Sequence, residues 1–302
     1  MAASRTHGIG VLGLGIMGRR MAAALRDHPR FRIVAAYDPA PPTGFDLPLM
    51  ASPEDVVGNR DVDCVYIAAP PAHHAAGVTL AVKSGKAVLC EKPLAPTVAI
   101  AEAMRDQVAA AARPAAVNFY FAAAEGATQM RHLVASGALG ELREARLTLR
   151  FRAWPRPWQA GAGKWLTSPT EGGFTREVCS HFLFQAERLF GPGHCAETSV
   201  RRGPQGTEVS LQARVDYARV VLQIDGAIAG AVDDTSRLEV VGSKASVALV
   251  DWDDLEWRGG GALPTVPSMP DQLAVMLDGK PHQLATFAEG TAVTALTEAL
   301  LA

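Results

Sequence analysis

The chain has 302 residues, of which 48% are hydrophobic and 20% are charged. At about 100–200 residues per domain, this length indicates two domains, each long enough to bury a core. The formal net charge is −2, from 29 basic and 31 acidic side chains. This balance gives no electrostatic reason to expect nucleic acid or an anionic membrane as a partner.

Export and membrane insertion are not expected. Residues 1–7 lead into a strand-like segment without the long apolar stretch of a signal peptide. No segment holds about 18 uninterrupted apolar residues, so a cytoplasmic location is expected. The cysteines form no C-x-x-C pair, and we expect reduced thiols at all four positions, which are Cys64, Cys90, Cys179 and Cys195.

Short apolar strands alternate with helices over residues 1–118. The predicted strands are Ile9–Leu12, Phe31–Tyr37, Cys64–Ala69, Ala87–Cys90 and Ala115–Phe119. The predicted helices are the stretch that ends at Leu25, Ala75–Lys83, and Thr97–Ala112 with Thr97 as its cap. Such alternation favours right-handed βαβ units and an α/β domain whose parallel sheet is buried on both faces.

Residues 119–302 have a different pattern and predict an α+β domain with a large, mainly antiparallel open sheet. Its predicted strands are Glu141–Arg152, Glu208–Tyr217, Arg219–Ile224, Arg237–Val241 and Ser246–Val250. Its predicted helices are Glu125–Ser136, Gly172–Phe190 and Leu284–Leu300. One face of such an open sheet should be covered by the first domain or the linking helix, and the other must be polar or buried in a partner.

A glycine-rich turn follows the first strand and opens the first helix, with the sequence Gly13-Leu14-Gly15-Ile16-Met17-Gly18. Gly13 permits the tight turn, Gly15 allows the backbone to approach a pyrophosphate, and Gly18 lets the helix pack closely on the strand. Free N–H groups and the helix dipole then face the anion. The turn predicts a dinucleotide-binding Rossmann domain over residues 1–118, with contacts from Ile16 and Met17 as well.

Asp38 ends the second strand, 20 residues after Gly18. A carboxylate at this place accepts hydrogen bonds from an adenosine ribose and repels a 2′-phosphate, which favours NAD. Arg19 and Arg20 begin the first helix and would suit either cofactor, so NADP stays possible.

The segment Glu91-Lys92-Pro93 directly follows the predicted strand Ala87–Cys90. Ligands of open α/β sheets bind beyond the carboxyl ends of strands, so Lys92 is expected near the glycine turn. Pro93 restricts Lys92 to an extended backbone. A lysine desolvated near a cationic nicotinamide is a candidate for proton exchange.

With these motifs the chain resembles the glucose–fructose oxidoreductase / inositol dehydrogenase (Gfo/Idh/MocA-type) family of NAD(P)-dependent oxidoreductases. The resemblance covers essentially the whole chain, and its most specific part is the segment that leads into Glu91-Lys92-Pro93. The matching segments, in order, are Gly13–Gly18, Pro70–His74, Gly85–Leu94, and Gly172-Gly173 followed by Glu177 and His181.

The resemblance implies roles for several residues of the first domain. Lys92 would be the catalytic acid/base, its bond to Pro93 would be cis, and Glu91 would contact the cofactor. The turn after the strand Cys64–Ala69 would also line the cofactor site, through Ala69, Pro70 and His74.

In the second domain the resemblance implies a catalytic pair. The family usually carries Asp and His there, and this chain has Glu177 and His181, four residues apart and therefore on one helix face. His181 would position the reacting oxygen or relay its proton. Glu177 would hold a neighbouring hydroxyl, with a reach altered by its additional methylene.

The chemistry of individual side chains suggests further substrate contacts. Arg176 is a candidate anchor for a carboxylate. Trp154 and Trp165 are candidates for an aromatic wall over the substrate, and the alternatives are a packing segment between strand and loop or an oligomer contact. Tyr120 lies in an apolar segment where sugar-acting relatives often carry an arginine. This departure favours a cyclic, aromatic or carboxylated hydroxy compound as much as a simple polyol.

The resulting hypothesis is an NAD(P)-dependent oxidoreductase that transfers a hydride between nicotinamide and a secondary alcohol or ketone. One alternative is a lyase or glycosidase that uses NAD without net redox change, and another is a dinucleotide-sensing regulator without catalysis. The histidines form no metal-binding cluster, so no metal is expected. The resemblance also implies that the domain of residues 119–302 binds substrate and mediates oligomerisation, as a homodimer or homotetramer.

Overall fold

The computed structural model describes residues 5–44, 46–230 and 233–302. The chain forms two compact units. The first contains the residues up to Phe119 together with Ser268–Thr291, and the second contains Tyr120–Pro267 and Ala292–Ala302. The predicted second domain includes Ser268–Thr291, which the structure groups with the first unit.

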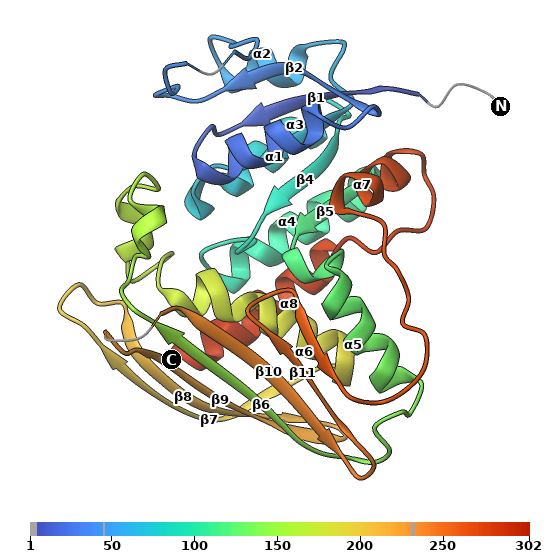
Figure 1. The fold of residues 1–302 in the computed structure, drawn as a ribbon. Helices are drawn as coiled ribbons and strands as arrows, with labels where there is room; N and C mark the ends of the chain where they lie inside the picture. Colours follow the sequence, from blue (N-terminus) through green and yellow to red (C-terminus); the bar gives the residue numbers. More distant parts are fainter. Residues whose placement is uncertain (1–4, 45, 231–232) are drawn as a thin grey trace. The chain divides into compact units, whose positions relative to one another are not determined.

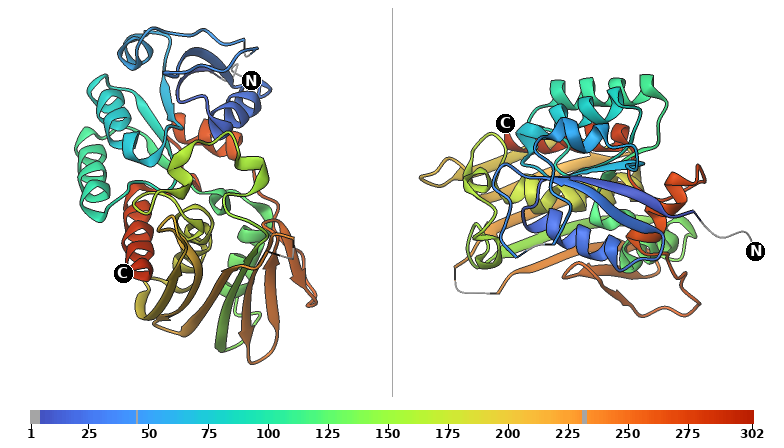
Figure 2. Two further views of the ribbon diagram at one scale, coloured as in Figure 1. Left: turned by 90° about the vertical axis from the view of Figure 1, so that its left-hand side faces the viewer. Right: turned by 90° about the horizontal axis from the view of Figure 1, so that it is seen from above.

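The first unit is built on a parallel sheet, which within the described residues has five strands in the order β2-β1-β3-β4-β5 (Figure 1). The strands are β1 (His7–Leu12), β2 (Phe31–Tyr37), β3 (Cys64–Ile67), β4 (Ala87–Glu91) and β5 (Ala115–Asn118). Helices lie on both faces of this sheet (Figure 2); they include α1 (Ile16–Arg26), α2 (Pro53–Gly58), α3 (His74–Lys83) and α4 (Val98–Ala111). The predicted α/β Rossmann domain is confirmed.

The register of this sheet brings three chain segments out at one edge. Leu12 pairs with Ile67, and Ile67 pairs with Cys90. The glycine turn and Ala68 therefore follow their strands, and Glu91 ends β4, at the same carboxyl edge, where open α/β sheets bind ligands. Strands β1, β3 and β4 are buried along their whole length, which explains why their sequences are nearly continuous apolar runs.

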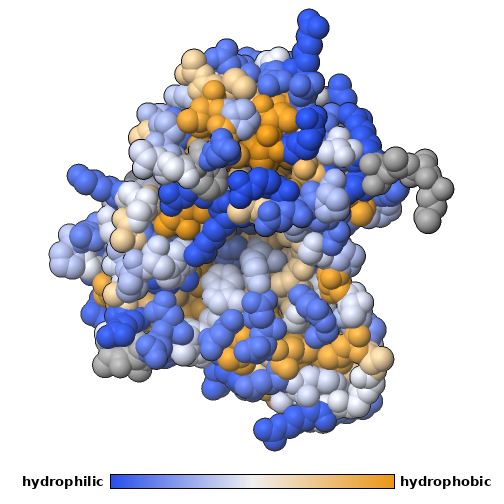
Figure 3. Space-filling view, turned by 45° about the horizontal axis from the view of Figure 1, so that its top comes forward, coloured by the Kyte–Doolittle hydropathy of each residue, from blue (hydrophilic) through white to orange (hydrophobic). Residues whose placement is uncertain are grey.

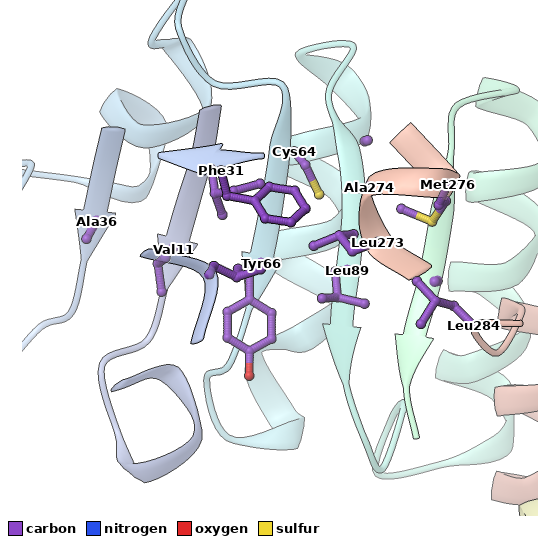
Figure 4. Close-up of a cluster of buried hydrophobic side chains, with 14 of the residues drawn as sticks. Val11, Phe31, Ala36, Cys64, Tyr66, Leu89, Leu273, Ala274, Met276 and Leu284 are labelled. Atoms are coloured by element: carbon purple, nitrogen blue, oxygen red, sulfur yellow. The ribbon is translucent and has the colours of Figure 1, made fainter. Parts of the chain in front are cut away.

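Helix α7 (Met269–Leu277) completes the first unit. Its Leu273, Ala274 and Met276 are buried in one cluster with Phe31 and residues of the central strands (Figure 4). This helix was not predicted, because it is short and follows a long irregular segment. Its apolar face packs against residues that are distant in sequence.

The second unit holds a mixed sheet, for which seven strands are described, in the order β12-β11-β10-β6-β9-β8-β7. Neighbours pair antiparallel except β6 and β9, so the predicted mainly antiparallel sheet is confirmed. The strands are β6 (Leu142–Phe151), β7 (His194–Arg202), β8 (Glu208–Tyr217), β9 (Val220–Ile228), β10 (Thr235–Gly242), β11 (Ser246–Val250) and β12 (Asp254–Trp257).

Two strands were not predicted, β7 and β12, and they form the two edges of this sheet. β7 is largely exposed and lacks the alternation of buried and exposed residues, and β12 has only four residues. Toward one face the inner strands direct charged side chains that form ion pairs, as Arg237 does with Glu256 over 2.8 Å. This face is therefore polar.

The opposite face of the sheet is covered by helices α5 (Glu125–Ala135) and α6 (Ser180–Phe190) (Figure 1). The last helix, α8 (Phe287–Leu301), begins in the first unit and ends in the second. The predicted helix Gly172–Phe190 is only partly correct. Its start is a π-helical turn, η5 (Thr175–Cys179), and the α-helix begins at Ser180.

The surface of the first unit carries hydrophobic patches interrupted by charged side chains, as Figure 3 shows toward its top. Such mixing is ordinary for globular proteins. In the part of the chain that the structure describes, no helix is long and apolar enough to cross a membrane. The four cysteines, all within the described residues, are unpaired.

Candidate active site

The glycine turn has the geometry of a phosphate cradle. Gly13 has φ = +98°, and a Cβ there would lie 2.7 Å from backbone atoms of Ala68. A Cβ at Gly18 would lie 2.0 Å from the carbonyl oxygen of Gly13. Gly15 is the N-cap of α1 without a side-chain cap, and no described atom lies within 4 Å of its would-be Cβ. Free N–H groups and open space at a helix N-terminus fit a pyrophosphate.

Asp38 is tied to this turn. Its Oδ2 accepts a hydrogen bond from the backbone N–H of Leu14 over 2.7 Å, and its Oδ1 accepts one from the N–H of Ala40 over 2.8 Å. The carboxylate thus fixes the second residue of the glycine turn against the end of β2. Its remaining lone pairs can accept ribose hydroxyls.

Glu91 lies at the centre of a buried hydrogen-bond network. It is 5% exposed, and its Oε1 accepts hydrogen bonds from Tyr66 Oη and from Asn118 Nδ2, each over 2.6 Å. Its Oε2 accepts the backbone N–H of Lys92 over 3.3 Å. Burial raises the pKa of the Glu91 carboxyl, and the hydrogen bonds from Tyr66 and Asn118 oppose that rise. Glu91 therefore holds strands β3, β4 and β5 together directly beside Lys92.

Tyr66 was not among the predicted site residues, because it stands within the apolar run of β3 and resembles an ordinary core residue. It is fully buried, and burial, followed by the nearby Glu91 charge, raises the pKa of its phenol well above the usual value. Asn118 is the last residue of β5 and was not singled out for this role either.

The peptide bond between Lys92 and Pro93 is cis, as the resemblance implied. His74, predicted to line the cofactor site, is buried and held by backbone carbonyls on both sides. It is 1% exposed, with Nε2 lying 2.8 Å from the carbonyl oxygen of Ala69 and Nδ1 lying 3.2 Å from that of Leu94. The ring thus links the Ala69-Pro70 turn to the segment after Lys92, and burial lowers the pKa of its imidazole.

In the second unit, Glu177 and His181 are not related as in a regular α-helix. Glu177 lies in η5 and His181 in α6. A π-helical turn hydrogen-bonds from residue i to i+5 and is frequent at functional sites. Ser180 also donates a hydrogen bond to the carbonyl oxygen of Arg176 over 2.6 Å. The assumed four-residue spacing on one helix face therefore does not apply directly.

His181 is surrounded by aromatic side chains. The backbone N–H of Tyr120 donates a hydrogen bond to Nδ1 of His181 over 3.2 Å. The His181 ring lies edge-on to Phe121 and to Trp252, with centroids 6.1 Å and 5.1 Å away. Trp252 was missed entirely, because nothing in the sequence links a turn residue at this position to His181.

Arg176, predicted as a carboxylate anchor for substrate, has its guanidinium occupied by contacts within the protein. Its guanidinium makes a bidentate ion pair with Glu298, over 2.7 and 2.8 Å. Its Nη1 donates to the carbonyl oxygens of Pro169 and Gly172. Its side chain is 7% exposed, so its role is to fasten the Gly172 loop to α8.

Trp154 packs against other residues of the second unit. Its Nε1 donates to the carbonyl oxygen of Leu166 over 3.0 Å, and its ring contacts Phe151 and Phe174. Trp165 is half-buried in the short turn Lys164–Thr167. Among the residues that the structure describes, no group of three or more His, Cys, Asp or Glu side chains is placed to hold a metal ion.

Known proteins match both units. Residues 7–119 match the description "Oxidoreductase family, NAD-binding Rossmann fold", and residues 127–248 match "GFO/IDH/MocA C-terminal domain". The solved structure of the WlbA dehydrogenase from Bordetella pertussis, in complex with NADH and UDP-GlcNAcA, superposes with a TM-score of 0.84 at 17% identity. It covers 98% of this chain and 95% of that one, which shows the shared fold.

Two curated relatives are similar over part of their length. The chain is 38% identical over 105 residues to inositol 2-dehydrogenase 1 of Saccharopolyspora erythraea, covering 30% of each protein. It is 30% identical over 141 residues to 2,7-anhydro-N-acetylneuraminate hydratase of Escherichia coli, covering 44% of this chain and 37% of the relative. The matched regions thus span less than half of these relatives. Because the two family descriptions together cover most of both units, the chain belongs to the GFO/IDH/MocA oxidoreductase family, with an NAD(P)-binding Rossmann domain and the family's C-terminal domain.

Proposed function

We propose that this protein is an NAD-dependent dehydrogenase or reductase for a secondary alcohol or ketone in a cyclic, sugar-like or carboxylated hydroxy compound. The observation that carries the proposal is the position of Lys92. It leaves β4 at the strand edge that also carries the glycine turn, and its neighbour Glu91 is held by Tyr66 and Asn118. Family membership supports the reaction type.

The first unit supplies the groups for the cofactor. The first turn of α1 and Gly15 would hold the pyrophosphate, and Asp38 would accept the ribose hydroxyls, which favours NAD over NADP. The turn at Ala69 and Pro70, near Gly13 in the sheet, would line the same cofactor.

The cofactor supplies the hydride chemistry, and the chain supplies binding, orientation and proton transfer. Lys92 would take the hydroxyl proton of an alcohol, or return it to a ketone. His181 would donate a hydrogen bond from Nε2 to the same oxygen, because its Nδ1 already accepts the N–H of Tyr120. Glu177 would hold a neighbouring hydroxyl.

Replacement of Lys92 tests the proposal. NADH formation is followed by absorbance for the wild type, Lys92→Met and the control Lys83→Met, whose side chain is exposed on α3. Loss of a general acid/base should lower kcat by about 10²–10⁴-fold, with NAD affinity nearly unchanged. Lys83→Met should behave like the wild type. Near-normal turnover by Lys92→Met would refute the role of Lys92.

A second candidate is an NAD-assisted lyase, which the similarity to a hydratase supports. Such an enzyme would form product without net NADH. Product analysis by mass spectrometry, beside the absorbance assay, separates the two reactions. A product formed without NADH would replace the dehydrogenase proposal by this one.

We also propose a homodimer or homotetramer, on the family resemblance. The polar face of the second sheet, with its ion pairs, would have to be matched by complementary charges on a partner. Light scattering that returned the monomer mass of 31.9 kDa at micromolar concentration would reject this proposal.

A further inference from the structure

The turn between β11 and β12 holds its backbone in an uncommon conformation. Two non-glycine residues have positive φ, +43° at Asp251 and +79° at Trp252. A bulky side chain rarely adopts this left-handed region. Such a conformation persists only where the surroundings fix it, and it is concentrated at functional sites.

Hydrogen bonds fix both sides of the turn. Asp251 and Ser236 exchange two of them, since the Asp251 N–H donates to the Ser236 carbonyl and the Ser236 N–H donates to Asp251 Oδ1, each over 2.9 Å. Asp253 Oδ1 accepts a hydrogen bond from Tyr120 Oη over 2.5 Å. The carbonyl oxygen of Asp253 also lies so close to Gly126 of α5 that a Cβ there would be 2.5 Å away. The turn is therefore anchored by hydrogen bonds on both sides of Trp252.

The held conformation places the indole of Trp252 against His181. The two ring centroids are 5.1 Å apart, and the ring planes meet at 78°. Trp252 also contacts Phe121 at 5.5 Å and Tyr120 at 5.8 Å. Phe121 is fully buried, whereas Tyr120 is 45% exposed and Trp252 is partly exposed. One side of this cluster, which includes His181 at 6% exposure, is thus core, and the other side is exposed at Tyr120 and Trp252.

The short hairpin loop between β11 and β12 itself calls for positive φ, which Gly, Asn or Asp usually supplies. A tryptophan at such a position is a costly choice, although its ring also packs on Phe121 and Phe182. The anchors at Asp251 and Asp253 hold one large flat ring in one orientation. Rigid aromatic rings beside a polar group are suited to bind a ligand that is itself flat and partly apolar.

We propose that Trp252 is a specificity-determining residue that binds the flat C–H face of a ring-shaped hydroxy compound, such as a cyclitol or a pyranose. The inference rests on the proposed function for the role of His181. It deepens that function, because an open-chain polyol has the same hydroxyl groups but no rigid apolar face to place on the indole.

Binding of matched cyclic and open-chain compounds tests this assignment. Calorimetric titrations with NADH present compare myo-inositol and D-glucose with D-sorbitol. The variants are Trp252→Phe and Trp252→Gly, the latter suited to φ = +79°, and the control is Trp257→Phe in β12. Trp252→Gly should weaken binding of the cyclic compound that the wild type binds by about tenfold or more. Its affinity for NADH should not change, Trp252→Phe should be intermediate, and Trp257→Phe should match the wild type.

Three results would overturn the assignment. They are equal weakening of cyclic and open-chain ligands, unchanged affinity in folded Trp252→Gly, and a wild type that binds neither cyclic compound. Thermal melting confirms folding, and Trp252→Asn replaces the glycine variant if that variant does not fold, since Asn tolerates positive φ. A wild type that binds a cyclic compound through Trp252 but never forms NADH would refute the proposed function and leave this assignment intact.

Discussion

The backbone N–H of Tyr120 points at Nδ1 of His181, with 3.2 Å between the two nitrogens. An N–H can only donate, so Nδ1 is an acceptor, and the proton of the neutral imidazole is carried by Nε2. A proton on Nδ1 would face the Tyr120 N–H and break this contact. This contact leaves Nε2 as the hydrogen-bond donor of the ring, so of the two roles expected from the sequence we favour positioning over proton relay.

Substitutions of His181 distinguish these roles. His181→Gln keeps an N–H donor that can reach toward the Nε2 position, and His181→Leu removes it. We expect kcat/KM to fall by about tenfold for Gln and by about 10²–10³-fold for Leu, typical of losing one preorganised donor. Steady-state kinetics with the preferred substrate measure both values. If the Gln variant were as inactive as the Leu variant, His181 would be exchanging a proton.

Tyr66 is expected to act as a positioning residue through Glu91. Removing its hydroxyl in Tyr66→Phe takes away a hydrogen bond that lowers the pKa of Glu91, while burial continues to raise that pKa. If the ionised carboxylate orients Lys92, activity is lost as the pH falls through the Glu91 pKa. The acid limb of the kcat/KM profile should therefore move to higher pH in Tyr66→Phe.

The control for this experiment is Tyr217→Phe. Tyr217 is a buried tyrosine of β8 whose hydroxyl has no hydrogen-bond partner in the described structure. Deleting that hydroxyl removes the same atom from a core without touching Glu91, so the pH profile should not move. Identical shifts in both variants would indicate a general effect of lost stability.

The sequence predicts the positions of those site residues that directly follow a recognisable strand or open a recognisable helix. The glycine turn follows a strand and opens a helix, and Lys92 follows the strand β4, so both positions can be predicted from the alternation of elements. Trp252 and Tyr66 could not be found in this way. Their partners His181 and Glu91 are 71 and 25 residues distant along the chain, and such contacts arise only when the strands are assembled.

Residues that are adjacent in sequence need not share a site, for a related reason. Arg176 precedes Glu177 and was expected to share its site, but its guanidinium pairs with Glu298, 122 residues away. The π-helical turn η5 was also not predicted, because it spans only five residues and a change in periodicity cannot be recognised over so short a segment.

Asp38 combines two roles that two substitutions can separate. Asp38→Asn keeps an oxygen that can accept the Leu14 N–H but removes the charge that repels a 2′-phosphate. It should lower the preference for NAD over NADP while retaining NAD affinity within about tenfold. Asp38→Ala also loses the anchor of the glycine turn and should weaken both cofactors. Calorimetric titration measures both preferences, and an unchanged preference in Asp38→Asn would show that charge at this position does not select the cofactor.

Arg176 should contribute to stability and not to substrate affinity. Its guanidinium is nearly buried, and its bidentate partner Glu298 is about one-quarter exposed, at 27%. Arg176→Ala would leave the Glu298 carboxylate without its partner, and it would also unpair the carbonyl oxygens of Pro169 and Gly172. Breaking a buried ion pair from one side costs about 3–5 kcal/mol, and the partial exposure of Glu298 puts the expected loss at or below about 3 kcal/mol.

Urea denaturation of Arg176→Ala, Glu298→Gln and the double variant measures this coupling. Because Glu298→Gln removes the charge that Arg176→Ala would leave unpaired, the double variant should lose less free energy of unfolding than the sum of the single variants. The KM values should stay close to those of the wild type in all three proteins, since the pair fastens the Gly172 loop and does not reach substrate. A large rise in KM for carboxylated substrates, without loss of stability, would restore Arg176 as the anchor that its sequence position first suggested.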